Sequence, residues 1–319
     1  MSLSVAILDD YQKVARDLAD WSRLPAGSGL TVFDRPLGDL DAAAAALAPF
    51  EALVIMRERT PFPAALIERL PKLRLLVTTG MRNNAIDLAA CAARGVTVCG
   101  TGAVGAPTAE LAWGLILALV KRIPAEDRAL REGRWQTGLT GSLEGRRLGL
   151  VGLGKLGTQV ARVGQAFGME VAAWSPNLTD ERAAAAGVTR LEKRDLFATA
   201  DVISVHLVLG ERTRGVVGAD EFAVMKPTAL FVNTSRAGLV DETALMAALR
   251  DGRIAGAGLD VFPVEPLSAN SPWLDLPNTV LTPHLGYVTK DNYAVYYRDA
   301  LEDILAWSAG TPRRLLTAG

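Results

Sequence analysis

One of only two histidines in this 319-residue chain, His284, stands in the segment LTPHLGY, directly after a short apolar run typical of a strand. Histidine titrates near neutrality, so its imidazole can give a proton to a substrate or take one from it. A histidine at a strand end can equally be a hydrogen-bonded cap. The segment alone therefore leaves general acid/base catalysis and a structural role open.

A glycine motif provides a second chemical signal. The segment VGLGKLG carries glycines in G-x-G-x-x-G spacing, directly after a strand pattern and at the start of a helical pattern. Such glycines allow a tight turn, let a pyrophosphate approach the backbone and let helix and strand pack closely. We therefore predict a dinucleotide site at Gly152, Gly154, Lys155, Leu156 and Gly157, with a simple glycine-rich turn as the alternative.

The choice of dinucleotide depends on the end of the next strand pattern. An acidic residue is expected there to hold the ribose hydroxyls, but the segment AAWSPNL places Ser175 near that position. A neutral serine would not repel a ribose phosphate, yet Pro176 and Asn177 provide no adjacent arginine to attract one. NAD and NADP both stay open, and NAD is favoured.

The elements that would position these residues alternate between strand and helix patterns. In the first hundred residues, VAIL, LTVF, ALVI, LRLLVTT and VTVC are separated by helical patterns, the first of them at Tyr11–Ala19. A second series runs through RLGLVGLG, EVAAWS, DVISVHL, ALFVNTS, IAGAGLDVF and NTVLTPH. This alternation predicts an α/β fold with two doubly wound parallel sheets, Rossmann-like or flavodoxin-like, and a cleft between the two domains.

The segment GTGAVGAP, residues 100–107, is the best linker between the two series. Pro107 would open a helix that runs to Arg122, where Pro124 interrupts it. A last helical pattern at Asp291–Ser308 has no strand after it, so we expect it to pack on the N-terminal layer. We therefore predict a discontinuous substrate (catalytic) domain of residues 1–101 and 288–319, and a nucleotide-binding Rossmann domain of residues 102–287.

Composition excludes several classes of partner. The formal charge of −1 gives no basic field for nucleic acid. The longest apolar run, Leu111–Val120, has about half the roughly 20 residues needed to cross a bilayer, so no membrane segment is expected. Cys91, Cys99 and two distant histidines give neither a disulfide framework nor a zinc spacing, so no metal is expected. The N-terminus lacks a basic leader, and we predict a cytoplasmic protein.

Three further segments, FVNTSRAGLVDE, GLDVFPVEPL and LTPHLGY, complete a pattern with VGLGKLG. Together they resemble the D-isomer-specific 2-hydroxyacid dehydrogenases, and TTGMRNNAIDLAACAARGVTV and AELAWGLILAL extend the likeness over most of the chain. The resemblance implies an NAD(P)-dependent oxidoreductase that interconverts a 2-oxo acid and its (R)-2-hydroxy acid. The expected substrate is therefore a small molecule.

The resemblance also implies roles for three residues. Arg236 would bind the carboxylate and carbonyl oxygen of the 2-oxo acid, since its planar guanidinium donates paired hydrogen bonds. His284 would be the general acid/base, and Glu265 would orient it and stabilise its protonated form. Taken singly, each residue also has a structural interpretation. Arg236 could form a surface salt bridge, Glu265 could be a solvated turn residue, and His284 could be a hydrogen-bonded strand cap.

Other positions match the family's cofactor side. Asp260 would contact the nicotinamide amide, with Thr234, Ser235 and Gly286 beside the cofactor. His206 matches a cofactor-side histidine, but Val208 replaces the usual proline, so packing alone is the alternative for His206. In the N-terminal domain, Gly80 and Met81 belong to a loop whose amides would meet the substrate carboxylate. Arg82, where the family usually has glycine, would add a positive contact or point to solvent, and Arg57 raises the same question.

Three other interpretations share this fold. Related dehydrogenases of formate carry glutamine where Glu265 stands. A nicotinamide-nucleotide-sensing corepressor could keep the same residues, and an inactive Rossmann-type domain could keep cofactor affinity alone. The helix from Pro107 and the following EDRALREGRW resemble a dimer-forming arm, so a homodimer is expected.

Overall fold

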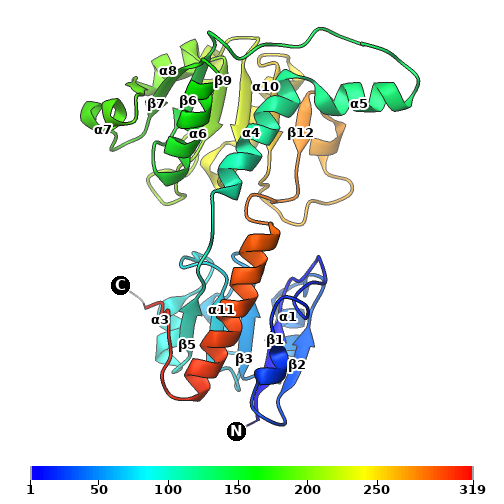
Figure 1. Ribbon diagram of the computed structural model, residues 1–319, viewed down its shortest axis with the longest axis vertical. Helices are drawn as coiled ribbons and strands as arrows, with labels where there is room; N and C mark the ends of the chain where they lie inside the picture. Colours follow the sequence, from blue (N-terminus) through cyan, green and yellow to red (C-terminus); the bar gives the residue numbers. More distant parts are fainter. Residues whose placement is uncertain (1, 318–319) are drawn as a thin grey trace. The chain divides into compact units, whose positions relative to one another are not determined.

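The computed structural model describes residues 2–317, which form two compact units, each with its own sheet (Figure 1). Among the described residues, unit 1 comprises the chain up to Gly105 and from Thr289 onward, and unit 2 is Ala106–Val288. That residues 1–101 and 288–319 form the substrate (catalytic) domain, and residues 102–287 the nucleotide-binding domain, stays a prediction. No helix within residues 2–317 is both long and apolar enough to cross a bilayer.

Unit 1 contains a five-stranded parallel sheet in the order β2-β1-β3-β4-β5, the flavodoxin-like order. β3 and β4 are buried along their whole length, as strands covered on both faces must be. The strands are β1 (Ser4–Ile7), β2 (Gly29–Val32), β3 (Ala52–Ile55), β4 (Leu75–Thr78) and β5 (Thr97–Gly100).

The helices of unit 1 are α1 (Leu40–Leu47), α2 (Ala64–Ile67), α3 (Leu88–Ala93) and α11 (Lys290–Ser308), with a 3₁₀ turn at Trp21–Arg23. α11 packs against β4 and begins where the side chain of Thr289 accepts a hydrogen bond from Asn292 N. Its buried residues recur at helical spacing, including Tyr293, Tyr296 and Tyr297. The chain thus returns to the N-terminal layer after unit 2.

The predicted helix at Tyr11–Ala19 is wrong, because the segment forms turns. The carboxylate of Asp10 accepts hydrogen bonds from Val14 N at 3.1 Å and Ala15 N at 3.0 Å. Lys13 has a φ of +58°, outside the helical region. A side chain that captures nearby backbone N–H groups offers the chain an alternative to a helix.

Unit 2 contains a seven-stranded parallel sheet in the order β12-β11-β10-β9-β6-β7-β8. The order reverses between β6 and β9, so this sheet is doubly wound. Its strands are β6 (Arg147–Val151), β7 (Glu170–Trp174), β8 (Thr189–Arg190), β9 (Val202–Val205), β10 (Leu230–Asn233), β11 (Gly256–Leu259) and β12 (Thr279–Leu281). The predicted α/β class with two parallel sheets is confirmed.

Helices cover both faces of this sheet (Figure 1). α4 (Pro107–Val120) and α6 (Lys155–Ala166) pack on one face, around a core that includes Trp113 and Leu150. The other face is covered by α8 (Lys193–Thr199), α9 (Ala219–Val224) and α10 (Glu242–Arg250), while α7 (Asp180–Ala185) precedes β8. Two 3₁₀ turns lie at Ala237–Leu239 and Pro272–Asp275.

The predicted helix Pro107–Arg122 ends two residues early. α4 stops at Val120, Arg122 takes a left-handed conformation with φ +53°, and α5 (Ile123–Arg131) starts with Pro124 in its first turn. Proline has no N–H and a fixed φ, so it suits a helix start better than a helix interior. Pro124 therefore opens a second helix instead of only ending the first.

Candidate active site

The predicted residues of unit 2 share one edge of its sheet. All strand pairs in this sheet are parallel, so their carboxyl ends lie together. The residues that directly follow these strands are Gly152 after β6, Ser175 after β7, His206 after β9, Thr234 after β10, Asp260 after β11 and Thr282 after β12. An edge of this kind is where open α/β sheets bind ligands.

The structure brings Glu265 and His284 into direct contact. The Oε2 atom of Glu265 lies 2.6 Å from Nδ1 of His284. Oε1 of the same carboxylate accepts a hydrogen bond from Phe262 N at 2.8 Å, which fixes the carboxylate near the end of β11. Both side chains stay partly accessible, with 20% of His284 and 30% of Glu265 exposed. A small molecule can therefore reach the imidazole.

The carboxylate of Glu265 also determines which tautomer the imidazole of His284 adopts. Because a carboxylate only accepts, we assign the Nδ1 proton to the bond with Glu265. Nε2 has no hydrogen-bond partner anywhere in residues 2–317, so it can exchange a proton with a ligand. The ring of Tyr287 packs edge-on against the imidazole, with ring centroids 5.3 Å apart. His284 is thus held by a carboxylate on one atom and by an aromatic ring.

Asp260 holds the loop that carries His284. Its Oδ1 accepts from the hydroxyl of Thr282 at 2.6 Å and from Leu285 N at 2.7 Å, and its Oδ2 accepts from Gly286 N at 2.9 Å. Asp260 is fully buried, and burial raises the pKa of its carboxyl, although these hydrogen bonds and the nearby His284 oppose the rise. His284 has a φ of +53°, which an L residue keeps only when its surroundings enforce it.

These three bonds span both sides of His284, so Asp260 positions the imidazole. The predicted contacts of Asp260 and Gly286 with a nicotinamide cofactor stay predictions.

Arg236 lies in a tight turn after β10. The side chain of Asn233 donates to the carbonyl of Arg236 at 3.0 Å and accepts from Ser235 N at 3.0 Å. The hydroxyl of Ser235 donates to Val205 O at 2.9 Å, which joins the turn to β9. Since β10, β11 and β12 are neighbours about 4.8 Å apart, the strand ends that precede Arg236 and His284 are separated by about 10 Å.

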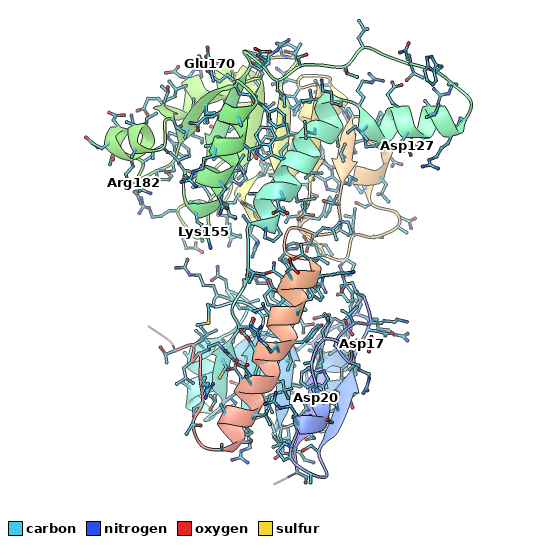
Figure 2. All side chains as sticks on the ribbon, viewed as in Figure 1. Asp17, Asp20, Asp127, Lys155, Glu170 and Arg182 are labelled. Atoms are coloured by element: carbon cyan, nitrogen blue, oxygen red, sulfur yellow. The ribbon has the colours of Figure 1, made fainter. Side chains whose placement is uncertain are left out.

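The glycine turn has the shape that a pyrophosphate requires. Gly152 has a φ of +110°, and a Cβ there would lie 2.8 Å from the backbone carbonyl of His206. A Cβ on Gly157 would collide with the carbonyl oxygen of Gly152, whereas a Cβ on Gly154 would meet nothing within 4 Å. Gly154 caps α6 without a side chain, and Lys155 and Leu156 begin the helix (Figure 2). The helix N-terminus is therefore open to an anion.

Two buried polar atoms at the same sheet edge have no partner in the described part of the chain. They are Nδ1 of His206 and Oγ1 of Thr234. Nε2 of His206 lies 2.9 Å from the hydroxyl of Ser204, and burial lowers the pKa of His206 to about 4, so the imidazole is neutral at pH 7. Buried polar groups without partners carry a cost that a hydrogen-bonding ligand removes. The residues present thus fit a dinucleotide.

The structure adds two arginines to the surroundings of Ser175. Ser175 is half-buried after β7, and Asn177 lies two residues on. Arg212 reaches Asn177 Oδ1 at 3.3 Å, and Arg182 reaches Asn177 O at 3.5 Å. Both arginines are exposed, and Arg182 is labelled in Figure 2. The sequence showed no arginine adjacent to Ser175, so these two were missed.

In unit 1, the predicted loop at Gly80 follows β4. Gly80 has a φ of +84°, and its N–H donates to the hydroxyl of Thr101 at 2.8 Å. The buried side chain of Asn83 donates to Thr78 Oγ1 at 2.9 Å and to Arg57 O at 2.6 Å. The positive φ favours glycine at this position, and the guanidinium of Arg57 lies where a Cβ of residue 80 would be.

Arg57 and Arg82 differ in their placement within unit 1. The side chain of Arg57 is 23% exposed and lies against Gly80, whereas Arg82 is exposed. The amide N–H groups of Met81 and Arg82 have no acceptor among the residues that the structure describes. Gly80 N–H is already bonded to Thr101, so Met81 and Arg82 carry the donors that an anion could use.

Sequence reasoning missed several residues that hold the predicted ones. Thr282 and Tyr287 support His284, and Thr101 and Asn83 support the Gly80 loop. For the two threonines, the sequence did contain a weak indication. Thr101 and Thr282 directly follow β5 and β12, and a polar residue directly after an apolar strand often lies at a functional sheet edge.

Comparison with known proteins identifies relatives over most of the chain. The family model described as "D-isomer specific 2-hydroxyacid dehydrogenase, NAD binding domain" matches residues 113–286. The chain is 39% identical over 280 residues to a D-3-phosphoglycerate dehydrogenase of Mycobacterium bovis, covering 85% of this chain and 52% of that protein. It is 36% identical over 255 residues to a glyoxylate reductase of Aeropyrum pernix, covering 77% and 76%.

A solved structure matches nearly the whole chain. The phosphoglycerate oxidoreductase of Vibrio cholerae O395 is 40% identical, with a TM-score of 0.90, over 97% of this chain and 99% of that chain. The chain spans about half the length of the phosphoglycerate dehydrogenases that it matches by sequence.

Proposed function

The chain belongs to the D-isomer-specific 2-hydroxyacid dehydrogenases, and on that basis we propose that it interconverts a 2-oxo acid and its (R)-2-hydroxy acid. The observation that carries the proposal is the 2.6 Å contact between Glu265 and His284, at the same sheet edge as the glycine turn. A proton-transfer pair beside a dinucleotide turn is what this reaction requires.

In the direction of reduction, a nicotinamide cofactor supplies a hydride to the carbonyl carbon when it is bound. His284 then gives the proton on Nε2 to the carbonyl oxygen, and it takes that proton back in the reverse direction. Glu265 accepts from Nδ1, so it keeps the imidazole in the correct orientation and stabilises its protonated form. Arg236 binds the substrate carboxylate and carbonyl oxygen through paired N–H donors.

Unit 1 supplies further proposed substrate contacts. The unused amides of Met81 and Arg82 and the guanidinium of Arg57 beside Gly80 suit a carboxylate or another anionic group of the substrate. If Arg57 binds an anionic group, Arg57→Ala will raise the KM of a doubly acidic oxo acid more than that of glyoxylate. Equal changes for both acids would contradict this role.

We propose NAD as the cofactor, held through Gly152, Gly154, Gly157 and the first turn of α6. The exposed arginines near Asn177 offer guanidinium donors to the ribose phosphate of NADP, so the two cofactors should be compared directly. Fluorescence titration should give a lower Kd for NADH than for NADPH. A lower Kd for NADPH that Arg212→Ala abolishes would contradict the preference for NAD.

Turnover tests the proposed function. The purified protein should oxidise NADH with glyoxylate, hydroxypyruvate, pyruvate or a bulkier 2-oxo acid. Arg236→Ala should raise the KM for the oxo acid and leave the Kd for NADH unchanged. No turnover with any of these acids, combined with binding of a peptide partner that depends on NADH, would favour the corepressor reading. The formate-dehydrogenase reading is not favoured, because Glu265 stands where those enzymes carry glutamine.

We also propose that the protein is a cytoplasmic homodimer. α5 and the following segment expose four apolar side chains, Ile123, Leu130, Trp135 and Leu139, and Leu139 is 97% exposed. Apolar surface concentrated on one segment favours association. Light scattering after gel filtration should give twice the mass of one chain for the wild type. The double variant Trp135→Ser/Leu139→Ser should have the mass of one chain. Leu274→Ser changes an exposed leucine outside α5 and the segment that follows it, and should leave the mass unchanged.

A further inference from the structure

The last described residues of the chain extend the sheet of unit 1. Gly100 N donates to Arg314 O at 2.9 Å, and Leu316 N donates to Val98 O at 2.8 Å. Leu315 and Cys99 form an antiparallel bridge between these bonds. The segment thus covers the free edge of β5, which would otherwise present unpaired backbone groups.

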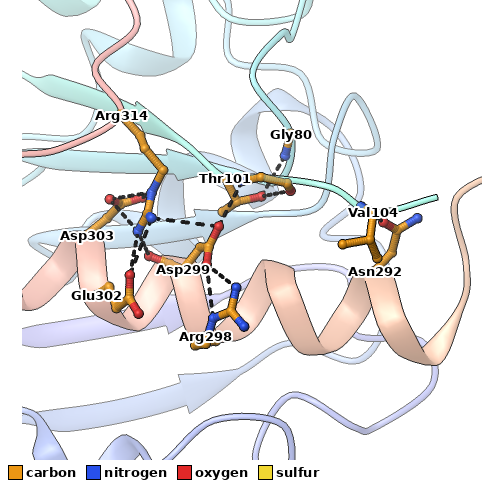
Figure 3. A network of polar contacts seen from close by, with 10 residues as sticks. Gly80, Thr101, Val104, Asn292, Arg298, Asp299, Glu302, Asp303 and Arg314 are labelled. Carbon is orange, nitrogen blue, oxygen red and sulfur yellow. Dashed lines mark hydrogen bonds and ion pairs between the residues drawn. The ribbon is translucent and has the colours of Figure 1, made fainter.

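The side chain of Arg314 enters a cluster of carboxylates on α11 (Figure 3). Its Nε lies 3.0 Å from Asp303 Oδ1, its Nη2 donates to Asp299 O at 2.8 Å, and Nη1 and Nη2 each lie 3.3 Å from Glu302 Oε2. The Asp303 side chain is fully buried, and burial raises the pKa of its carboxyl to about 6, against the opposing effect of Arg314. Removing Arg314 would leave buried acidic groups without their cation.

Asp299 connects this cluster to the strand end after β5. Its Oδ2 lies 3.7 Å from Nη1 of Arg314 and accepts from Gly102 N at 2.9 Å. The fully buried Thr101 donates its hydroxyl to Gly102 O at 3.1 Å and accepts from Gly80 N at 2.8 Å. A continuous set of polar contacts therefore runs from Arg314 to the Gly80 loop, as Figure 3 shows.

A second route runs through the backbone. A Cβ on Gly100 would lie 2.7 Å from Gly80 O and 3.2 Å from Met81 Cα, so Gly100 packs directly against the Gly80 loop. The N–H of the same Gly100 donates to Arg314 O. The Arg314 residue therefore supports one loop twice, once through its side chain and once through its backbone carbonyl.

We infer that Arg314 is a positioning residue for substrate binding: through Asp299, Gly102 and Thr101 it fixes the Gly80 loop, whose free amides at Met81 and Arg82 receive the substrate anion. This inference rests on the proposed function, in which that loop binds the oxo acid. A loop held at Gly80 keeps the next two amides in place before the substrate arrives, which lowers the cost of ordering them on binding.

Arg314→Ala and Thr101→Val break the route at its two ends, and Arg298→Ala is the matched control. Arg298 also donates to Asp299, at 3.0 Å, but its side chain is 60% exposed, so this ion pair contributes little. With NADH and glyoxylate as probes, we expect Arg314→Ala and Thr101→Val each to raise the KM for glyoxylate about tenfold. The Kd for NADH should stay within twofold. The double variant should show a smaller rise than the product of the two single rises.

Hydrogen exchange gives a readout that needs no turnover. The amide protons of Gly80 and Gly102 should exchange faster in Arg314→Ala than in the wild type, and at the wild-type rate in Arg298→Ala. If Arg314→Ala does not fold, Asp299→Ala, which cuts the route between Arg314 and Gly102 and leaves the C-terminal segment intact, carries the test with the same measurements. An unchanged KM with unchanged exchange at Gly80, or a multiplicative double variant, would overturn the inference. Absence of turnover in the wild type would overturn the proposed function only, because the exchange measurement would still decide the role of Arg314.

Discussion

Asp260→Asn is the most informative single substitution, because the carboxylate of Asp260 accepts three hydrogen bonds in the loop that carries His284. Two donors, the hydroxyl of Thr282 and Leu285 N, face one oxygen, and Gly286 N faces the other. An asparagine that keeps its oxygen toward the first two donors turns its NH₂ group toward Gly286 N–H. One bond is lost, and two buried donors face each other.

A buried donor left without an acceptor costs about 1–3 kcal/mol. If this free energy destabilises only the loop conformation that holds His284, the fraction of molecules with His284 in place falls by about 5- to 150-fold. The conversion takes about 1.4 kcal/mol as a factor of ten. We expect kcat to fall by the same factor. Global stability should change little, because the substitution also removes a buried charge whose ionisation burial opposes.

The assay is steady-state oxidation of NADH by an oxo acid, with the Kd for NADH from fluorescence and the melting temperature from circular dichroism. Asp275→Asn, an exposed acid of the same unit, is the control and should match the wild type. A folded Asp260→Asn protein with kcat within twofold of the wild type would show that Asp260 does not hold His284 in place. A loss of NADH affinity as large as the loss in kcat would instead assign Asp260 to the cofactor.

Three further predictions concern single titratable residues. Glu265→Gln removes the charge beside His284, worth about 1.5–3 kcal/mol, so kcat/KM should fall about 10- to 150-fold at an unchanged Kd for NADH; a change below twofold would contradict this. Asp303 has a folded pKa raised from 3.8 to about 6, so its stabilising contribution is present below pH 4 and lost as the pH rises through 6. The free energy of unfolding of the wild type relative to Asp303→Asn should therefore fall by up to about 3 kcal/mol between pH 4 and 7, and a difference independent of pH would refute it. His206 has a folded pKa lowered from 6.5 to about 4, so its contribution is present above pH 6.5 and lost as the pH falls through 4. In denaturant titrations, the free energy of unfolding of the wild type relative to His206→Gln should fall by up to about 3 kcal/mol between pH 6.5 and pH 4. A difference that does not depend on pH would argue against burial of a neutral imidazole.

Features that depend on neighbouring residues could be predicted from the sequence. Gly152, Gly154 and Gly157 lie within six positions, and the strand before them and helix after them follow from local patterns. The alternation of strands and helices was enough for the α/β class, because parallel strands need crossover helices. The helix at Tyr11–Ala19 failed for a local reason too, since one side chain, Asp10, captured two backbone N–H groups.

Contacts between distant segments could not be derived from patterns alone. Glu265 and His284 are 19 positions apart in the segments that follow two different strands, and their 2.6 Å contact depends on β11 and β12 being neighbours in the sheet. Arg212 reaches Asn177 across 35 positions, and Asp299 reaches Gly102 across 197. Such contacts follow from which strands and helices become neighbours, so they appear only once the fold is known.

The central claim is that His284 transfers a proton while a separate part of unit 2 binds the cofactor. Single-turnover oxidation of NADH by an oxo acid, measured by stopped flow in the wild type and in His284→Gln, tests it most directly. We expect the variant to bind NADH with a Kd within twofold of the wild type and to oxidise NADH about 10²- to 10⁴-fold more slowly. Oxidation at the wild-type rate in His284→Gln would show that His284 is not the proton donor.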